Sequence, residues 1–318
     1  MRSTQLAEMQ RSRLIAGAVG AIEELGYART TVGHITARSR VSRRTFYELF
    51  ANREECLAAV LEDVVGLVAV ELAAAGIDGL PWRERVRMGL AAILGFFDRE
   101  PALARVCVVQ VLQGGPRVLE RREEILAGLA AVIDEGRLEG ARGGERSSLT
   151  AEGLVGAAFA IVYARLLRGE RKPLAGLLGE LMGMIVLPYL GPAVARREQA
   201  RSAPVLPRVA RLGGSRGLPL AGDPLRGVPV RLTYRTARVL EGVAEHPGAS
   251  NRMVADYAGI VDPGQISKHL RRLERVGLLA NRGRGHAKGE PNAWTLTAKG
   301  EQVVQSVRVP APSQRKAA

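Results

Sequence analysis

Apolar residues recur at intervals of three and four along residues 10–190, and no run of alternating β-branched residues occurs there. This spacing places apolar side chains on one face of a helix and predicts a mainly α-helical region. Glycine and proline interrupt the pattern and divide it. We expect nine helices, near 11–25, 32–39, 43–50, 53–75, 82–99, 101–113, 117–137, 150–168 and 174–189.

The pattern is lost at residues 191–229, which are rich in proline, glycine and arginine. A segment of this composition keeps no periodic apolar face, so we predict a linker. A periodic pattern returns at Val230 and continues to residue 308. The last segment, 309–318, is predicted to be a disordered tail.

The pattern of apolar and polar positions in residues 230–308 predicts three helices, a β-hairpin and a final helix. Ser250 and Asp262 suit helix N-caps, and Pro263 suits the first turn of the third helix. An apolar stripe with the period of a helix runs along that third helix. A basic, glycine-rich tip then separates two short apolar segments, as in a hairpin with a long turn. We expect a small α+β domain.

Residues 29–55 predict two short helices joined by a tight turn, which is a helix-turn-helix motif. Phe46 and Phe50 are four residues apart and face inward from the second helix, which leaves Arg43 and Arg44 outside. The N-terminal part of such a second helix is where recognition helices meet base edges and phosphates.

The formal net charge of +14 is concentrated at the two ends, while residues 54–195 carry a net charge of −4. Basic ends favour a polyanionic partner, because neutralised phosphates release condensed counterions. The two cysteines, Cys56 and Cys107, are too far apart for a C-x-x-C motif, which excludes a disulfide framework and a zinc ribbon. No apolar stretch reaches the roughly 20 residues of a membrane span. We expect a cytoplasmic protein that binds no membrane.

Three stretches carry a family resemblance: T-T-V-x-x-I at 30–35, V-S-x-x-T-F-Y-x-x-F at 41–50 and N-R-E-E at 52–55. On these residues the chain resembles the TetR family of bacterial transcription regulators. The resemblance implies a nine-helix unit, with a DNA-binding domain at 1–55 and a helical dimerisation and effector domain at 56–190. Two departures occur: Ser39 and Arg40 occupy the turn, where the family usually has small residues and glycine, and Thr36 replaces a usual alanine.

The resemblance also implies roles for individual residues. The expected DNA-binding residues are Thr31 and Tyr47 on phosphates, Arg43, Arg44 and Thr45 in the major groove, Ser42 at the helix start, and Arg53 on the backbone. The last two helices, 150–168 and 174–189, would form a homodimer. The residues predicted to line an effector pocket are Phe96, Phe97, Cys107, Gln110 and Tyr163. An apolar lining favours a small hydrophobic effector. We expect no metal site and no cofactor.

Residues 230–308 resemble the winged-helix domains of the MarR group, on the stretch Q-I-S-K-H-L-R-R-L-E-R-V-G-L-L-A and the later W-T-L-T-A-K-G. Side chains of the third helix are expected in a DNA groove: Gln265, Ser267, Lys268, His269 and Arg272. Glutamine and arginine have the donor geometry to read base edges. The wing is expected to hold DNA through Arg282, Arg284 and Lys288.

These features together predict a ligand-responsive repressor that binds a palindromic operator in double-stranded DNA and carries a second DNA-binding domain. One alternative is that the winged helix docks a protein. Another is an architectural protein that binds DNA with little specificity. An enzyme is not expected, because the sequence has no catalytic triad pattern, no H-E-x-x-H and no P-loop.

Overall fold

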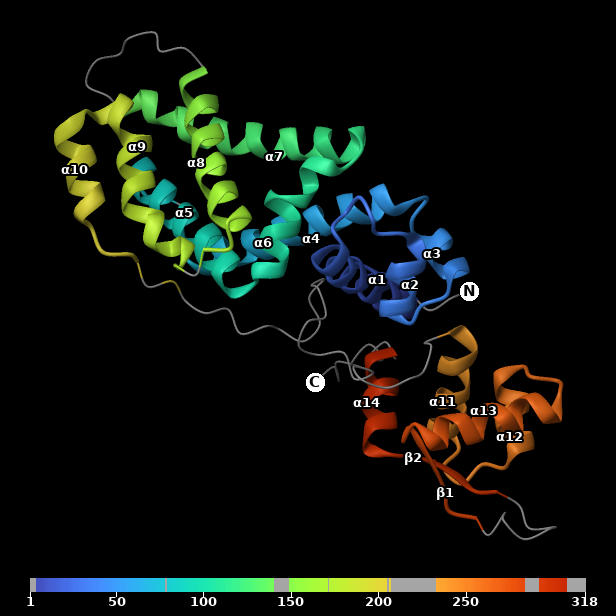
Figure 1. The fold of residues 1–318 in the computed structure, drawn as a ribbon. Coiled ribbons are helices and arrows are strands. Elements are labelled where there is room, and N and C mark those ends of the chain that lie inside the picture. Colours follow the sequence, from blue (N-terminus) through green and yellow to red (C-terminus); the bar gives the residue numbers. More distant parts are fainter. Residues whose placement is uncertain are drawn as a thin grey trace, which may run out of the picture. The chain divides into compact units, whose positions relative to one another are not determined.

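The computed structural model describes residues 4–77, 79–139, 149–170, 172–204, 206, 233–283 and 292–307. The chain forms two compact units. One comprises Met1–Ala16, Ile35–Ala51 and Pro219–Ala318, and the other comprises Gly17–His34 and Asn52–Leu218. Helices dominate both units (Figure 1).

The helical pattern predicted for residues 10–190 is confirmed, with boundaries shifted by a few residues and an earlier start for the first helix. The α-helices of this part are α1 Thr4–Leu25, α2 Val32–Ser39, α3 Arg43–Leu49, α4 Arg53–Ala74, α5 Trp82–Arg99, α6 Pro101–Val108, α7 Pro116–Asp134, α8 Leu149–Leu167 and α9 Leu178–Leu190. Three short 3-10 helices accompany them: η1 Gln110–Gln113, η2 Glu135–Leu138 and η3 Leu174–Leu177.

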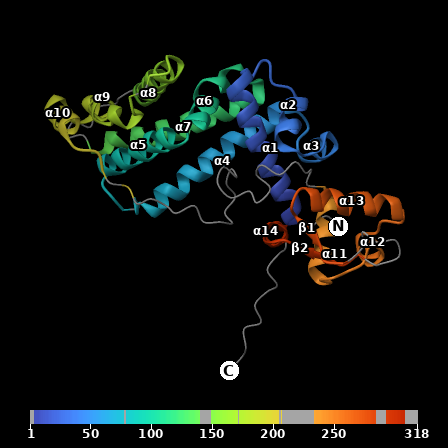
Figure 2. The ribbon, with the colours of Figure 1, turned by 60° about the horizontal axis from the view of Figure 1, so that its bottom comes forward.

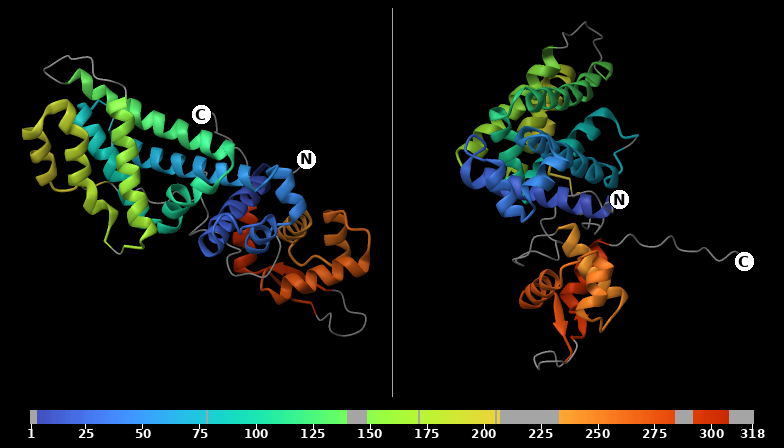
Figure 3. Two further views of the ribbon diagram at one scale, coloured as in Figure 1. Left: turned by 45° about the horizontal axis from the view of Figure 1, so that its top comes forward. Right: turned by 90° about the vertical axis from the view of Figure 1, so that its right-hand side faces the viewer.

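The helices of the second unit pack in layers around α4, α5 and α7. Helix α7 packs against both α4 and α8, while α5 packs against α4 and α9; α4 and α7 run side by side in Figure 3. Trp82 at the start of α5 is buried, and its indole N–H donates to the carbonyl of Val132 at 2.7 Å. Its ring meets Tyr189 edge-on at 5.4 Å, which ties α5 to α7 and α9.

A tenth helix, α10 Pro192–Ala200, corrects the prediction that the linker begins at residue 191. Proline suits its first turn, and Glu198 is buried, so the segment has an inner face despite its composition. Helix α10 lies along α9 (Figure 2). The approach is so close that a Cβ at Gly179 would lie 2.5 Å from the backbone carbonyl oxygen of Gln199. Glycine at position 179 therefore allows the two helices to pack this closely.

The C-terminal domain has the predicted order of elements. These are α11 Tyr234–Glu245, α12 Asn251–Ala258, α13 Pro263–Arg275, β1 Leu279–Asn281, β2 Trp294–Leu296 and α14 Ala298–Val307. Strands β1 and β2 are antiparallel, with Asn281 opposite Trp294. Both predicted N-caps are present, since Ser250 accepts from Met253 and Asp262 accepts from the second and third residues of α13.

A compact apolar core holds these elements together, and it also includes Leu6 of α1. It includes Val239 and Leu240 of α11, Ile266 and Leu270 of α13, and Trp294 of β2, all buried. The apolar stripe of α13 therefore faces inward as its spacing predicts, and the opposite face of that helix is left to its polar residues.

Candidate nucleic-acid interface

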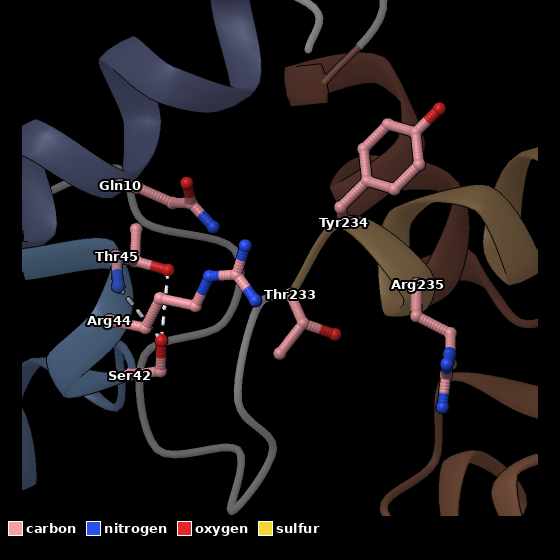
Figure 4. A pocket seen from close by; sticks show the side chains of 7 residues that line it. All are labelled: Gln10, Ser42, Arg44, Thr45, Thr233, Tyr234 and Arg235. Carbon is pink, nitrogen blue, oxygen red and sulfur yellow. Dashed lines mark hydrogen bonds between the residues drawn. The ribbon is translucent and has the colours of Figure 1, made fainter. Parts of the chain in front are cut away.

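Ser42 starts helix α3 and holds its first turn. Its hydroxyl oxygen accepts from the backbone N–H of Thr45 at 3.0 Å and lies 2.9 Å from the Thr45 hydroxyl (Figure 4). Thr45 is buried. Its side chain supports the helix start in this structure, and its contact with the major groove stays a prediction.

Helix α3 separates an apolar inner face from a polar outer face. Phe46 and Phe50 are buried, with ring centroids 5.6 Å apart. Tyr47 is 59% exposed, and its ring rests edge-on against Phe46. Arg43 is exposed as well. The i, i+4 spacing of the phenylalanines thus fixes which residues the helix presents to a partner.

Arg44 is a highly accessible arginine on this helix. Its side chain is 87% exposed, and its Nε lies 3.2 Å from a carboxylate oxygen of Glu48 one turn later. An exposed pair of this kind contributes at most about 1 kcal/mol. A DNA phosphate can therefore replace the glutamate as the partner of Arg44 at little free-energy cost.

Thr31 caps helix α2 together with His34. The His34 N–H donates to the Thr31 hydroxyl oxygen at 3.3 Å, and the Thr31 N–H lies 3.3 Å from Nδ1 of His34. This reciprocal arrangement resembles a capping box. Thr31 is exposed, and its hydroxyl proton is left to donate to a phosphate oxygen.

Arg53 holds a loop of the protein. Its Nη1 donates to the carbonyls of Tyr27, Ala28 and Thr30 at 3.1, 3.3 and 2.6 Å. The guanidinium also lies over the Tyr27 ring, 4.7 Å from its centroid. The structure thus uses Arg53 to fix the connection between α1 and α2, and its contact with the DNA backbone stays a prediction.

Gln110 reaches the same loop, which the sequence did not reveal. Its side-chain oxygen accepts from the backbone N–H of Tyr27 at 2.9 Å, across 83 residues of sequence. Gln110 therefore links η1 to the segment that leads into the helix-turn-helix. The helices α4 to α10, with η1 among them, are called the helical body below. Neither periodicity nor a motif marks such a contact, because one side chain meets one distant backbone group.

The other residues predicted to line an effector pocket lie in or beside the core. Phe96 and Phe97 are buried, with ring centroids 6.1 Å apart. Burial raises the pKa of the Cys107 thiol to about 12, so this thiol stays protonated. Tyr163 is half-exposed on α8. The pocket remains a prediction. Within the described ranges, no three His, Cys, Asp or Glu side chains gather as a metal site would require.

Helix α13 presents Gln265, Lys268 and Arg272 to solvent. The side-chain oxygen of Gln265 accepts from Arg235 of α11 at 2.9 Å, which leaves its NH₂ group to donate. The Ser267 hydroxyl, by contrast, donates to the Pro263 carbonyl at 2.8 Å. Ser267 therefore serves the helix itself more than an outside partner.

Asparagine side chains that the sequence analysis missed join the hairpin to α12 and α13. The side-chain oxygen of Asn251 accepts from the Trp294 indole at 2.6 Å and from Asn292 at 3.0 Å, while its NH₂ donates to Ser267 at 2.9 Å. Asn292 in turn accepts from Asn281 at 2.7 Å. This network fixes the base of the hairpin relative to the exposed face of α13.

Arg282 begins the wing and is exposed, while its backbone N–H donates to the Ala293 carbonyl at 2.8 Å. This position fits the predicted DNA contact without testing it. Arg284 and Lys288, the other two wing residues predicted to bind DNA, lie outside the described residues.

His269 of α13 is half-buried beside two cations. Burial lowers its pKa below the usual 6.5, and the positive charges of Arg235 and Arg272 lower it further. Its Nε2 is shielded from solvent and has no hydrogen-bond partner among the described residues. The folded domain therefore holds a neutral imidazole.

We expect the C-terminal domain to lose stability as the pH falls below about 6.5, because the unfolded chain then binds a proton that the folded His269 resists. Thermal unfolding followed by circular dichroism between pH 5 and 7.5 checks this. The His269→Gln variant, which has no titrating group, should show a flatter dependence. Equal slopes for the two proteins would contradict the assignment.

Residues 14–60 match the family model of the bacterial regulatory proteins of the tetR family. This stretch of the chain is similar to the tetR family, and it spans α2 and α3. The matched residues also reach into the first turns of α4. No curated protein matches the chain at a significant level.

Two solved structures are similar to part of this chain. The fatty acid degradation regulator FadR from Bacillus halodurans superimposes with a TM-score of 0.50 at 19% identity, covering 56% of this chain and 94% of its own. The transcriptional regulator FadR from Bacillus subtilis in complex with stearoyl-CoA gives a TM-score of 0.48 at 19% identity, covering 55% and 96%. The first establishes a TetR-like fold for slightly more than half of the chain.

Proposed function

We propose that this TetR-family chain is a cytoplasmic repressor whose homodimer binds a palindromic operator through α3. The observation that supports this most directly is the outer face of α3, where Arg43, Arg44 and Tyr47 are exposed over two buried phenylalanines. Arginine forks can read guanine edges or hold phosphates. Selection of bound sequences from random duplex DNA tests the proposal, and a palindromic motif is the expected result.

We expect Arg43→Ala or Arg44→Ala to weaken operator binding by roughly 1–3 kcal/mol, or to relax the base preference, because each removes a positively charged fork from the face of α3. Fluorescence anisotropy with the selected duplex measures this. Arg105→Ala is the matched control, since it removes an exposed arginine from α6. If both α3 variants bind like the wild type, α3 is not the reading surface.

The dimer is proposed to form through α8 and α9. Helix α8 is the one helix of the described residues that is long and apolar enough to cross a membrane by length and composition, and its apolar window is 22% buried. Gly156 and Ala160 are exposed on it, as is Leu187 on α9. A two-fold partner would cover these residues. Light scattering should give twice the chain mass of 34.1 kDa.

The C-terminal domain is proposed to be a second, MarR-like DNA-binding unit. Gln265, Lys268 and Arg272 share the exposed face of α13, and Arg282 begins the wing beside it. A linker makes the binding of a second site intramolecular and so raises the overall affinity. A Lys268→Ala and Arg272→Ala double variant of the full chain should then lose part of the selected motif.

A separate observation favours the alternative that this domain docks a protein. Val261, between α12 and α13, is 97% exposed, and Met253 of α12 is 49% exposed. Large exposed apolar side chains are one feature of protein-binding surfaces. An unchanged motif and affinity in the α13 double variant would favour docking over DNA binding.

The regulator is further proposed to respond to a small hydrophobic effector bound in the helical body. Effector binding would shift an equilibrium between two arrangements of the reading helices. The Gln110–Tyr27 hydrogen bond offers a route from the body to the α1–α2 loop. The B. subtilis structure was determined with stearoyl-CoA, so a long-chain acyl-CoA is the first probe. Failure of any hydrophobic probe to change operator affinity would count against this part.

A further inference from the structure

Arg40 lies in the turn between α2 and α3 with a φ of +55°. It is the one residue other than glycine with positive φ among those that the structure describes. This backbone conformation is unfavourable for an L-residue, because Cβ approaches the following carbonyl oxygen. Glycine would adopt it without that penalty.

The turn is held in shape by groups other than the Arg40 side chain. The Ser39 hydroxyl donates to the Thr36 carbonyl at 3.4 Å and accepts from the Val41 backbone N–H at 3.3 Å. Val41 is buried and anchors the end of the turn. No contact in this turn requires an arginine side chain at position 40. The unfavourable backbone conformation is therefore not offset by packing of that side chain.

The guanidinium of Arg40 also has a donor nitrogen without an acceptor. Its Nη1 is shielded from solvent yet has no hydrogen-bond partner among the described residues. A shielded donor without a partner is unfavourable, more so when the group is charged. Arg43, which follows closely, forms no ion pair within the part of the chain that the structure covers. The turn therefore carries positive charge that the protein does not neutralise.

We propose that Arg40 binds a DNA phosphate at the edge of the groove that α3 enters. When a recognition helix lies in the major groove, the helix before it crosses the sugar-phosphate backbone, and the turn between them lies close to that backbone. A phosphate oxygen would supply the acceptor that the guanidinium lacks. This inference rests on the proposed role of α3 in DNA binding.

The test compares Arg40→Gly, Arg40→Lys and the control Arg105→Ala in the full chain, each titrated onto the selected duplex at several salt concentrations. Loss of one phosphate contact should lower the slope of log K against log salt by about 1. For Arg40→Gly we expect binding weakened roughly 3- to 10-fold near 0.1 M salt, from the same counterion release. Arg40→Lys keeps the charge and should keep most of the slope.

Thermal unfolding of the same variants separates a phosphate contact from a structural role. Glycine relieves the strained φ, so the midpoint of Arg40→Gly should be no lower than that of the wild type. A lower midpoint together with weaker binding would overturn the inference, and so would unchanged affinity and slope in Arg40→Gly. If Arg40→Gly is unchanged while Arg43→Ala is weakened, only the Arg40 inference fails. If no variant differs from the wild type, the role of α3 fails with it.

Discussion

Arg87→Ala should lower the free energy of unfolding of the helical body by about 3–5 kcal/mol, because it leaves a buried carboxylate without its main partner. Arg87 of α5 and Glu198 of α10 are each 2% exposed in their side chains, and Nη1 of the arginine lies 2.8 Å from a carboxylate oxygen. The guanidinium also donates to the carbonyls of Arg201 and Ser202 at 2.7 and 2.9 Å. One side chain thus holds α10 and the residues that follow it.

The neighbouring charges do not replace Arg87. Arg83 and Arg201 approach Glu198 at 3.4 and 3.3 Å, but both are well exposed to solvent. Arg201 is also shared with Glu84, whose carboxyl pKa is lowered chiefly by this hydrogen bond. Screening by water makes such exposed partners weak. We therefore expect them to compensate only a minor part of the loss.

Chemical denaturation followed by circular dichroism measures the effect of Arg87→Ala. The double variant Arg87→Leu and Glu198→Leu is the control, since removal of both charges leaves no buried ion unpaired and should restore most of the stability. A single variant within about 1 kcal/mol of the wild type would show that Glu198 finds other partners or water.

Trp294→Ala should unfold the C-terminal domain while the helical body stays folded. Trp294 is buried in the core of this domain, and its indole donates to Asn251 at 2.6 Å. Truncation of a buried tryptophan to alanine lowers stability by about 3–5 kcal/mol. At the usual roughly 0.05–0.15 kcal/mol per residue, a domain of this size has about 4–11 kcal/mol in total, so this loss removes most or all of its stability. The network around Asn251 would also lose its strongest donor.

The chain contains only two tryptophans, and one lies in each part: Trp82 in the helical body and Trp294 in the C-terminal domain. Protein labelled with 5-fluorotryptophan should therefore give one ¹⁹F resonance for each part. In Trp294→Ala the Trp82 resonance should stay at its native position while circular dichroism shows an early, partial loss of helix. Trp294→Phe, which keeps most of the volume, should unfold much later. Loss of the native Trp82 resonance in the same transition would contradict independent folding.

Local sequence signals predicted much of the fold because they act over a few residues. The helices up to residue 190 followed from spacing and from the glycines and prolines between them. The N-caps at Ser42, Ser250 and Asp262 formed as expected, since a capping side chain bonds to backbone within three residues. The outer face of α3 followed in the same way from Phe46 and Phe50.

The same local reasoning failed where a side chain chooses a distant partner. It placed residues 192–200 in the linker, because this segment has few apolar residues. The segment is stabilised as a helix by packing against α9 and by the hydrogen bond from Arg87 to Glu198. It did not predict that Arg53 donates to the carbonyls of the α1–α2 loop.

The sequence by itself determined the helical architecture, the helix-turn-helix with its arginine-bearing face, and the order of helices and strands after residue 230. Only the tertiary structure decided that Gln110 meets Tyr27, that Asn251 joins the hairpin to α13, and that Arg87 holds α10. The physical reason is the range of each interaction. Periodicity and capping are set by neighbours along the chain, whereas a buried polar group takes whichever partner the folded backbone brings within about 3 Å.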